Sequence, residues 1–161
     1  MSQPPRDGGF TLIELLVTMT LMGIMMAIAV SGYSSWAKAS QQSGAAHELQ
    51  SLLRNTQQRA ITEGQSMCVQ FDTGANTYTI FRGRCVAPVE TVQGATKAAS
   101  GSVRLAAPSF TPPGPPPVAD QAAVEFTSRG TAWPGSVKFT RAGATDQTIT
   151  VEGLTGRATL D

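Results

Sequence analysis

Residues 10–30 read FTLIELLVTMTLMGIMMAIAV, and this apolar stretch predicts a membrane-spanning helix in the N-terminal part of the chain. A helix of about 21 residues is roughly 30 Å long, which matches the hydrocarbon core of a bilayer. Glu14 is the one ionisable residue in the stretch. A carboxylate inside a membrane costs about 2.5 to 3.5 kcal/mol at the bilayer centre and less near its surface, so Glu14 is a candidate functional residue.

Two simpler interpretations of this segment are a secretory signal peptide and a plain membrane anchor. The residues before it, MSQPPRDGG, contain one arginine that Asp7 offsets, and no A-x-A-like cleavage site follows the apolar run. A signal peptide is therefore disfavoured. Neither interpretation explains why a carboxylate lies four residues into the apolar stretch.

The sequence Gly8-Gly9-Phe10-Thr11-Leu12-Ile13-Glu14-Leu15-Leu16 resembles the prepilin processing and methylation motif of type IV pilins and type II secretion pseudopilins. The resemblance implies that a membrane-embedded prepilin peptidase cuts after Gly9 and that the new amino terminus, Phe10, is methylated. It also implies that Glu14 pairs with the amino terminus of a neighbouring subunit. Two charges that are each costly in a membrane then become one paired site. An uncleaved anchor is the alternative.

The composition excludes several classes of protein. The chain has 161 residues, 14% of them charged, and a net charge of +1, so it has room for one domain and no strong overall field for nucleic acid. Two cysteines are too few for a disulfide scaffold or a structural zinc site. His47 is the single histidine and is expected on the surface, and no hydrolase, metalloprotease or P-loop motif is present. We therefore expect no enzyme activity, no metal and no cofactor.

The helix is predicted to continue beyond the apolar stretch to about Glu63. Small and apolar residues recur there at spacings of three and four and form one stripe, and Gly64 suits a helix end. The sequence thus divides into a leader, residues 1–9, a membrane-spanning segment, residues 10–33, and a soluble domain, residues 34–161. The residues of the stripe are Ala45, Leu49, Leu52, Leu53, Thr56 and Ala60.

The remainder of the chain has the pattern of short strands. Residues 67–71 and 77–82 predict a hairpin around a turn at 72–76. Residues 108–117 hold six prolines, and because proline has no N–H to donate, we expect an exposed, extended loop that does not pair in a sheet. The fold class is therefore α+β, a long helix packed on an antiparallel sheet. Further strands are expected at 103–106, 124–127, 137–140, 148–152 and 158–160.

A second resemblance concerns the soluble domain. Residues 45–64 resemble the GspH/FimT subgroup of minor pilins, and residues 151–158 look like the Gly-Arg ending of that subgroup. Some relatives bind DNA during uptake through basic residues near the C-terminus. Here the tail retains only Arg157, and DNA binding through Arg157 is the alternative function. Phosphate contacts need several cations on one face.

Cys68 and Cys85 flank the predicted hairpin. A domain translocated out of the cytoplasm would hold them where disulfides persist, and a bridge between them would stabilise the fold by roughly 3 kcal/mol on the chain-entropy model. We favour a disulfide. Two reduced thiols are the alternative, because sequence does not show whether the two Cα atoms come within reach.

Together these features predict a minor pilin or pseudopilin, a structural subunit rather than an enzyme. We expect a single pass through the cytoplasmic membrane with the C-terminal domain outside, followed by assembly into a pilus or pseudopilus. The implied partners are prepilin peptidase, other pilin or pseudopilin subunits and the assembly platform in the cytoplasmic membrane, with DNA as the alternative. The same N-terminal features occur in subunits of type IV pili, competence pili and type II secretion pseudopili. The sequence therefore does not distinguish these three systems. A membrane-anchored binding module that is never processed is the other competing hypothesis.

Overall fold

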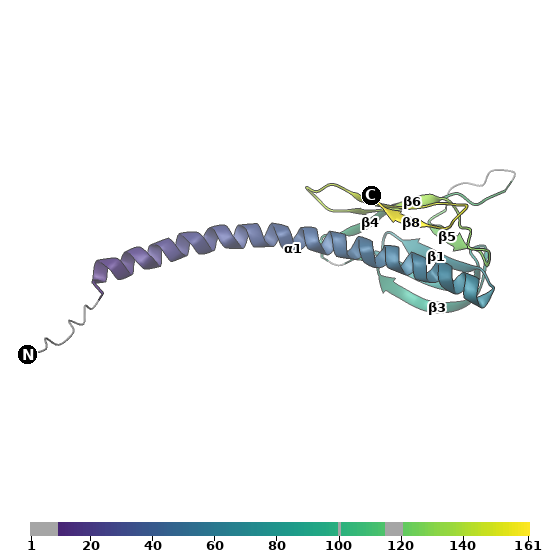
Figure 1. The fold of residues 1–161 in the computed structure, drawn as a ribbon, viewed down its shortest axis with the longest axis horizontal. Coiled ribbons are helices and arrows are strands. Elements are labelled where there is room, and N and C mark those ends of the chain that lie inside the picture. The colour runs from purple at the N-terminus through teal and green to yellow at the C-terminus, as the bar shows by residue number, and fades with distance from the viewer. Residues whose placement is uncertain (1–9, 100, 115–120) are drawn as a thin grey trace, which may run out of the picture. The chain divides into compact units, whose positions relative to one another are not determined.

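The computed structural model describes residues 10–99, 101–114 and 121–161, so the predicted leader lies outside the described residues. The chain divides into two compact units, one ending at Ala37 and one comprising Lys38–Asp161. The described elements (Figure 1) are α1 (Leu12–Glu63), β1 (Met67–Asp72), β2 (Thr77–Arg84), β3 (Ala87–Lys97), β4 (Arg104–Phe110), β5 (Ala123–Phe126), β6 (Gly135–Thr140), β7 (Gln147–Val151) and β8 (Ala158–Leu160).

In the first unit, α1 is apolar and exposed on all sides. It is the one described helix that is long and apolar enough to cross a membrane, with a mean hydropathy of 2.2 over 18 residues, none of them buried. The hydroxyls of Thr18 and Thr20 donate hydrogen bonds to the carbonyls of Leu15 and Val17, each at 2.9 Å. These two polar groups are therefore satisfied within the helix, as a hydrocarbon environment requires.

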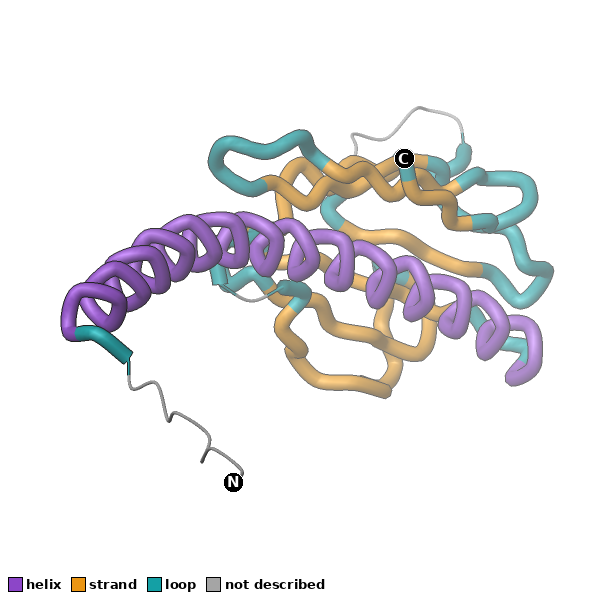
Figure 2. Tube along the Cα trace, turned by 60° about the vertical axis from the view of Figure 1, so that its left-hand side comes forward, coloured by secondary structure: helices purple, strands orange, loops and turns teal. Residues whose placement is uncertain are grey.

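In the second unit, α1 buries the predicted stripe. Ala45, Leu49, Leu53, Thr56 and Ala60 are buried, and Leu52 is partly buried against the core, which confirms the spacing argument. The apolar members join residues of both sheets in one hydrophobic core, and Figure 2 shows this part of the helix lying against the strands. The burial of these side chains supplies most of the helix's stability, because propensity alone contributes little.

The end of α1 at Gly64 is also confirmed. Gly64 has a φ of 66°, a left-handed conformation that glycine adopts without steric cost. Its N–H donates to the carbonyl of Ile61 at 3.3 Å, and the N–H of Gln65 donates to the carbonyl of Ala60 at 3.1 Å. This pair of bonds is the Schellman motif, which satisfies the last carbonyls of the helix and turns the chain into β1.

The strands form two four-stranded antiparallel sheets rather than one. Their orders are β3-β2-β1-β5 and β4-β6-β7-β8. The predicted hairpin is present, with Met67 opposite Arg82 and Asp72 opposite Thr77. The fold class predicted from the sequence, a long helix on antiparallel strands, is thus confirmed.

The expectation for residues 108–117 is wrong at its N-terminal end. Strand β4 continues through Pro108 to Phe110, and Ser109 and Phe110 lie opposite Ser136 and Gly135 of β6. A bulge between Ala106 and Ser109 takes Pro108 out of the ladder, so its missing N–H costs nothing. Phe110 is completely buried. Residues 115–117 lie outside the described residues.

Strand β3 was not expected either. It lies at the edge of its sheet and pairs only with β2, through a register interrupted by bulges. Most of its side chains are exposed on both faces, so no alternation of apolar and polar residues marks it in the sequence. Pro88, Glu90 and the bulges are features that protect an exposed edge from pairing with another chain.

Candidate functional site

The first turn of α1 carries the predicted assembly motif. Phe10 is exposed, and Gly9, on the other side of the predicted cleavage point, lies outside the described residues. Glu14 is exposed in the first helical turn, where the helix dipole favours a negative charge. Among the residues that the structure describes, no basic side chain forms an ion pair with Glu14.

Thr11 is a residue of this motif that the sequence reasoning did not use. The N–H of Glu14 donates to Thr11 Oγ1 at 3.3 Å, so the threonine caps the helix. The spacing Thr-x-x-Glu is the sequence signature of a capping box. The cap and the acid together begin the helix at Leu12, two residues after Phe10, the predicted new N-terminus.

Cys68 and Cys85 form the predicted disulfide. Their Cα atoms are 5.1 Å apart and their sulfur atoms 2.08 Å apart. Cys68 is completely buried in β1, and Cys85 lies in the turn between β2 and β3. The bridge therefore fastens that turn to the start of the central strand.

Glu125, in β5, is a buried carboxylate that the sequence did not reveal. It is 3% exposed and lies opposite Cys68 in the β1–β5 ladder. Its Oε2 accepts the N–H of Cys85 at 3.0 Å, and its Oε1 lies 3.6 Å from Nε of the largely exposed Arg84. A buried carboxylate is tolerated only with such partners, so Glu125 holds the same turn that the disulfide fastens.

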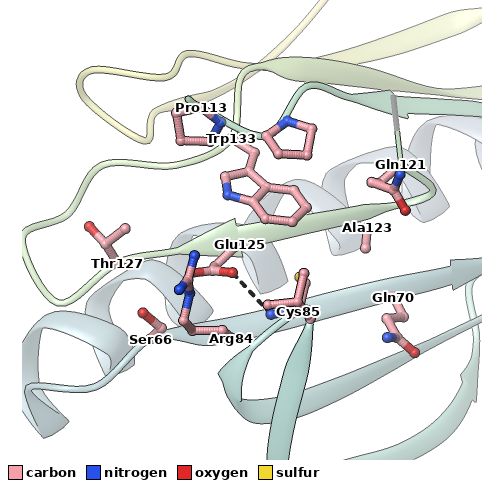
Figure 3. Close-up of a pocket in the computed structure, with 12 residues that line it drawn as sticks. Ser66, Gln70, Arg84, Cys85, Pro113, Gln121, Ala123, Glu125, Thr127 and Trp133 are labelled. Atoms are coloured by element: carbon pink, nitrogen blue, oxygen red, sulfur yellow. Dashed lines mark hydrogen bonds and ion pairs between the residues drawn. The ribbon is translucent and has the colours of Figure 1, made fainter. Parts of the chain in front are cut away.

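A cavity of about 590 Å³ lies over this carboxylate. Figure 3 shows Trp133 between Pro113 on one side and Glu125 on the other, with Arg84 at the edge. Trp133 is buried. The walls come from four separate segments of chain, around residues 66–70, 84–86, 112–113 and 121–133.

Polar residues of α1 bind the second sheet through its backbone. Gln42 is buried and donates to the carbonyls of Phe139 and Thr145 at 3.1 and 2.9 Å. Gln50 and Arg54 both donate to the carbonyl of Ala158, at 3.2 and 3.1 Å. The sequence alone does not reveal these partners, because the carbonyls lie in segments far along the chain.

Gly156 and Arg157 have different surroundings. Gly156 has a φ of 63°, and a Cβ on it would lie 2.3 Å from the carbonyl oxygen of Gly130 and 2.4 Å from Nε2 of Gln57. Arg157 is exposed, and none of the ion pairs among the described residues includes it. The glycine of the Gly-Arg ending is thus explained by close packing, whereas Arg157 is free to bind a partner. His47 is exposed, as predicted.

No group of three or more histidine, cysteine, aspartate or glutamate side chains in the described part of the chain is arranged to hold a metal ion. The described residues present an apolar helix with an acid in its first turn and a sheet unit with exposed basic side chains.

Two protein-family models match this chain. Residues 4–30 match the model of the prokaryotic N-terminal methylation motif, and residues 45–155 match the model described as type II transport protein GspH. The chain belongs to the GspH family. This match covers most of the soluble unit and confirms the resemblance to pilins and pseudopilins.

Individual relatives agree with this assignment. Two fimbrial proteins of Pseudomonas aeruginosa are 33% identical to this GspH-family protein over 82 residues, which cover 47% of the chain and 53% of each relative. The match thus spans about half the length of these relatives. The minor pseudopilin EpsH of the Vibrio cholerae type 2 secretion system has a similar fold, with a TM-score of 0.56 at 17% identity over 75% of this chain and 96% of EpsH. The type IV minor pilin FimU of P. aeruginosa gives 0.52 at 15% identity over 78% of this chain and 92% of FimU.

Proposed function

We propose that this protein is a minor pilin or pseudopilin, a structural subunit that assembles into a filament through its N-terminal helix. The observation that carries the proposal is the order of residues from Gly9 to Glu14: a cleavable glycine, an apolar first residue, a helix cap, and an acid in the first turn of a membrane-spanning helix. Prepilin peptidase cuts after Gly9, releases residues 1–9 and methylates Phe10.

The charges explain why assembly depends on this order. Cleavage creates a positive amine at Phe10, and Glu14 has no basic partner among the described residues. A carboxylate and an amine, each costly alone in hydrocarbon, are both neutralised when the Glu14 of one subunit meets the Phe10 amine of its neighbour. The pair fixes the register of one helix against the next, which is the best-attested use of a buried polar pair.

The proposed location follows from the same helix. Residues 10–33 cross the cytoplasmic membrane once, with residues 34–161 outside, and the subunit leaves the membrane from the assembly platform when it joins the filament. The disulfide supports an extracytoplasmic soluble unit, because such bonds persist in oxidising compartments. The filament is a type IV pilus or a type II secretion pseudopilus; relatives of both kinds share this fold.

Replacement of Glu14 tests the assembly role. We expect Glu14→Ala to be cut and methylated normally but to enter filaments at least about tenfold less often, since the amine of the neighbouring subunit would stay unpaired in the filament core. The measurement is the amount of protein in sheared filaments relative to that in membranes. Met22→Leu, a change of an exposed apolar residue in the same segment, is the control and should assemble normally. Normal assembly of Glu14→Ala would refute the pairing.

A DNA-binding minor pilin is the second candidate, and the exposure of Arg157 without an ion pair from the described residues favours it. Contacts of arginine with phosphates make binding sensitive to salt. Salt-sensitive retention of the protein on DNA that is lost in Arg157→Ala would support this function. If Arg157→Ala were retained on DNA as strongly as the unchanged protein, Arg157 would not contribute to DNA binding.

A further inference from the structure

One end of the second unit collects its exposed apolar side chains. Strands β1, β3 and β6 begin at the end where α1 finishes, and β2, β5 and β7 end there. In the first sheet this follows from the pairings of Met67 with Arg82 and Phe126 and of Arg82 with Glu90. The bridge between Phe126 and Ala132 and the pairing of Gly135 with Val151 extend it to the second sheet. We call this region the α1 end. Within the described part of Lys38–Asp161, the most exposed large apolar residues all lie in segments at this end: Ile61, Val86 at 74%, Val89 at 80% and Leu154 at 87% exposure.

The opposite end of the unit differs from the α1 end in its exposed side chains. It consists of the turns at 72–77, 97–104 and 140–147, and among the described residues these turns carry no large exposed apolar side chain. The difference between the two ends is informative, because single exposed apolar residues are ordinary but a group of them in one region marks an interaction site.

Two hollows lie within the α1 end. The cavity of about 590 Å³ over Glu125 includes Val86 in its wall, and a second hollow of about 500 Å³ is lined by Leu154 and Pro134. Pro113 lines both, so the two hollows are neighbours. Pockets of this size accept an inserted side chain, and such anchors contribute most of the binding energy of a protein interface.

The charged groups around these hollows leave a positive excess. Glu63 forms ion pairs with Arg59 and Arg82, and Glu90 pairs with Arg82 as well. Glu125 is buried. Three arginines remain exposed to a partner: Arg84, which only partly engages Glu125, and Arg129 and Arg157, for which the described residues supply no ion pair. Among the described residues of this region, Glu152 is the one exposed acid outside the ion pairs.

We propose that the α1 end docks an acidic segment of a different filament subunit, whose projecting apolar side chain enters the hollows beside Pro113. This inference rests on the proposed function, since it takes the partner from the same filament. The arginines complement the acidic residues of the partner, and the hollows take its apolar side chain.

A second copy of this chain and DNA both fit the surface less well. The α1 end of a second copy would set arginines against arginines, so a copy would have to offer its opposite end instead. The described residues of its turns include three basic ones (Lys97, Arg104, Arg141) and two acidic ones (Asp72, Asp146), and Asp161 lies beside them, so that end has no acidic excess. DNA would leave the apolar side chains and hollows without a partner, whereas protein–DNA interfaces are polar.

Site-specific cross-linking in the full-length protein tests the proposal. A photoreactive amino acid replaces Leu154 or Val86 in cells that assemble the filament, and the adduct is mapped by mass spectrometry. We expect attachment to another pilin-like subunit at an apolar residue flanked by Asp or Glu.

The double variant Arg129→Glu with Arg157→Glu should lower the cross-linking yield about tenfold. Neither arginine holds an ion pair among the described residues, so folding should be unaffected. The same probe at Ala142, in the opposite end, should give no such adduct.

Three results would overturn the inference: a nuclease-sensitive adduct, an adduct with a second copy of this chain, or no adduct while the protein assembles. If the double variant Arg129→Glu with Arg157→Glu gave the same cross-linking yield as the unchanged protein, the proposed role of the arginines would be wrong. A second change tests the pairing from the other side. Replacing the mapped acidic residue of the partner by Lys should restore the cross-linking yield with this double variant. The mass and filament content of the protein in the same cells separate the two proposals. A processed, assembled protein without the adduct refutes only the docking surface, whereas an unprocessed protein refutes the proposed function itself.

Discussion

Asn76 anchors the turn between β1 and β2 to the rest of the second unit. It is 5% exposed and has a φ of 58°, a left-handed conformation that few residues other than glycine adopt. Its amide donates to the carbonyls of Ala99 and Val103 at 3.0 and 3.2 Å, and its Oδ1 accepts the N–H of Leu105 at 2.7 Å. One side chain thus ties the turn to the segment that leads into β4.

We expect Asn76→Ala to lower the free energy of unfolding by about 3 kcal/mol or more. The substitution leaves three buried backbone groups without partners and puts a Cβ-bearing residue with no compensating side-chain bond in a left-handed conformation. Urea denaturation of the two proteins measures the difference. Thr73→Ala, an exposed change in the same turn, should lower it by no more than about 0.5 kcal/mol. Equal losses in the two variants would contradict this role of Asn76.

At the scale of elements, a charge network joins the end of α1 to the edge of the first sheet. Glu63 of α1 pairs with Arg59 at 3.0 Å and with Arg82 of β2 at 2.9 Å, and Arg82 also pairs with Glu90 of β3. The hydrogen bonds from Arg59 and then Arg82 lower the pKa of Glu63 below its ordinary value of 4.5. Arg82 in turn has a raised pKa, chiefly because of Glu63.

This pKa shift predicts a pH dependence. A carboxylate whose pKa is lower in the folded state stabilises the fold above its unfolded pKa, near 4.5, and loses that contribution as the pH falls through the folded value. Glu63→Gln should therefore have a lower Tm than the unchanged protein at pH 7, and the difference should vanish well below pH 4.5. Asp146→Asn, an exposed change at the opposite end, is the control and should give little difference at either pH. A Tm difference for Glu63→Gln that persists at low pH would contradict the network.

The elements also show what the sequence predicts and what it does not. The stripe from Ala45 to Ala60 and the helix end at Gly64 were predictable because helical spacing and a left-handed glycine act locally. Strand β3 was not predictable, since its order comes from backbone pairing with β2 and leaves no apolar pattern. The end of β4 was missed because a bulge, which depends on the facing strand β6, removes Pro108 from the ladder.

The candidate sites also divide into those that local sequence predicts and those that only the folded chain reveals. The N-terminal motif was predictable because its residues are consecutive, and the disulfide because its cysteines flank a predicted hairpin. The buried Glu125 and the cavity over it were not, because the walls come from four segments that only the folded chain brings together. The basic residues of the α1 end likewise come from separate turns.

On the scale of the whole molecule, the chain joins two parts of opposite composition. The apolar part of α1 buries none of its side chains within the described structure, whereas Lys38–Asp161 has its own hydrophobic core, disulfide and hydrogen-bonded helix. A segment of this kind is stable only when something outside the chain covers it, first lipid and then, on the proposed function, the helices of other subunits.

The intact mass of the protein recovered from membranes and filaments shows whether the chain is processed as a pilin and assembled in that form. Processing after Gly9 predicts a chain that begins at Phe10, lacks residues 1–9, carries one additional methyl group and has its two cysteines oxidised to a disulfide. Recovery of a chain that begins at Met1 in both fractions would contradict the account, because an uncleaved leader leaves Glu14 without the amine that it is proposed to neutralise.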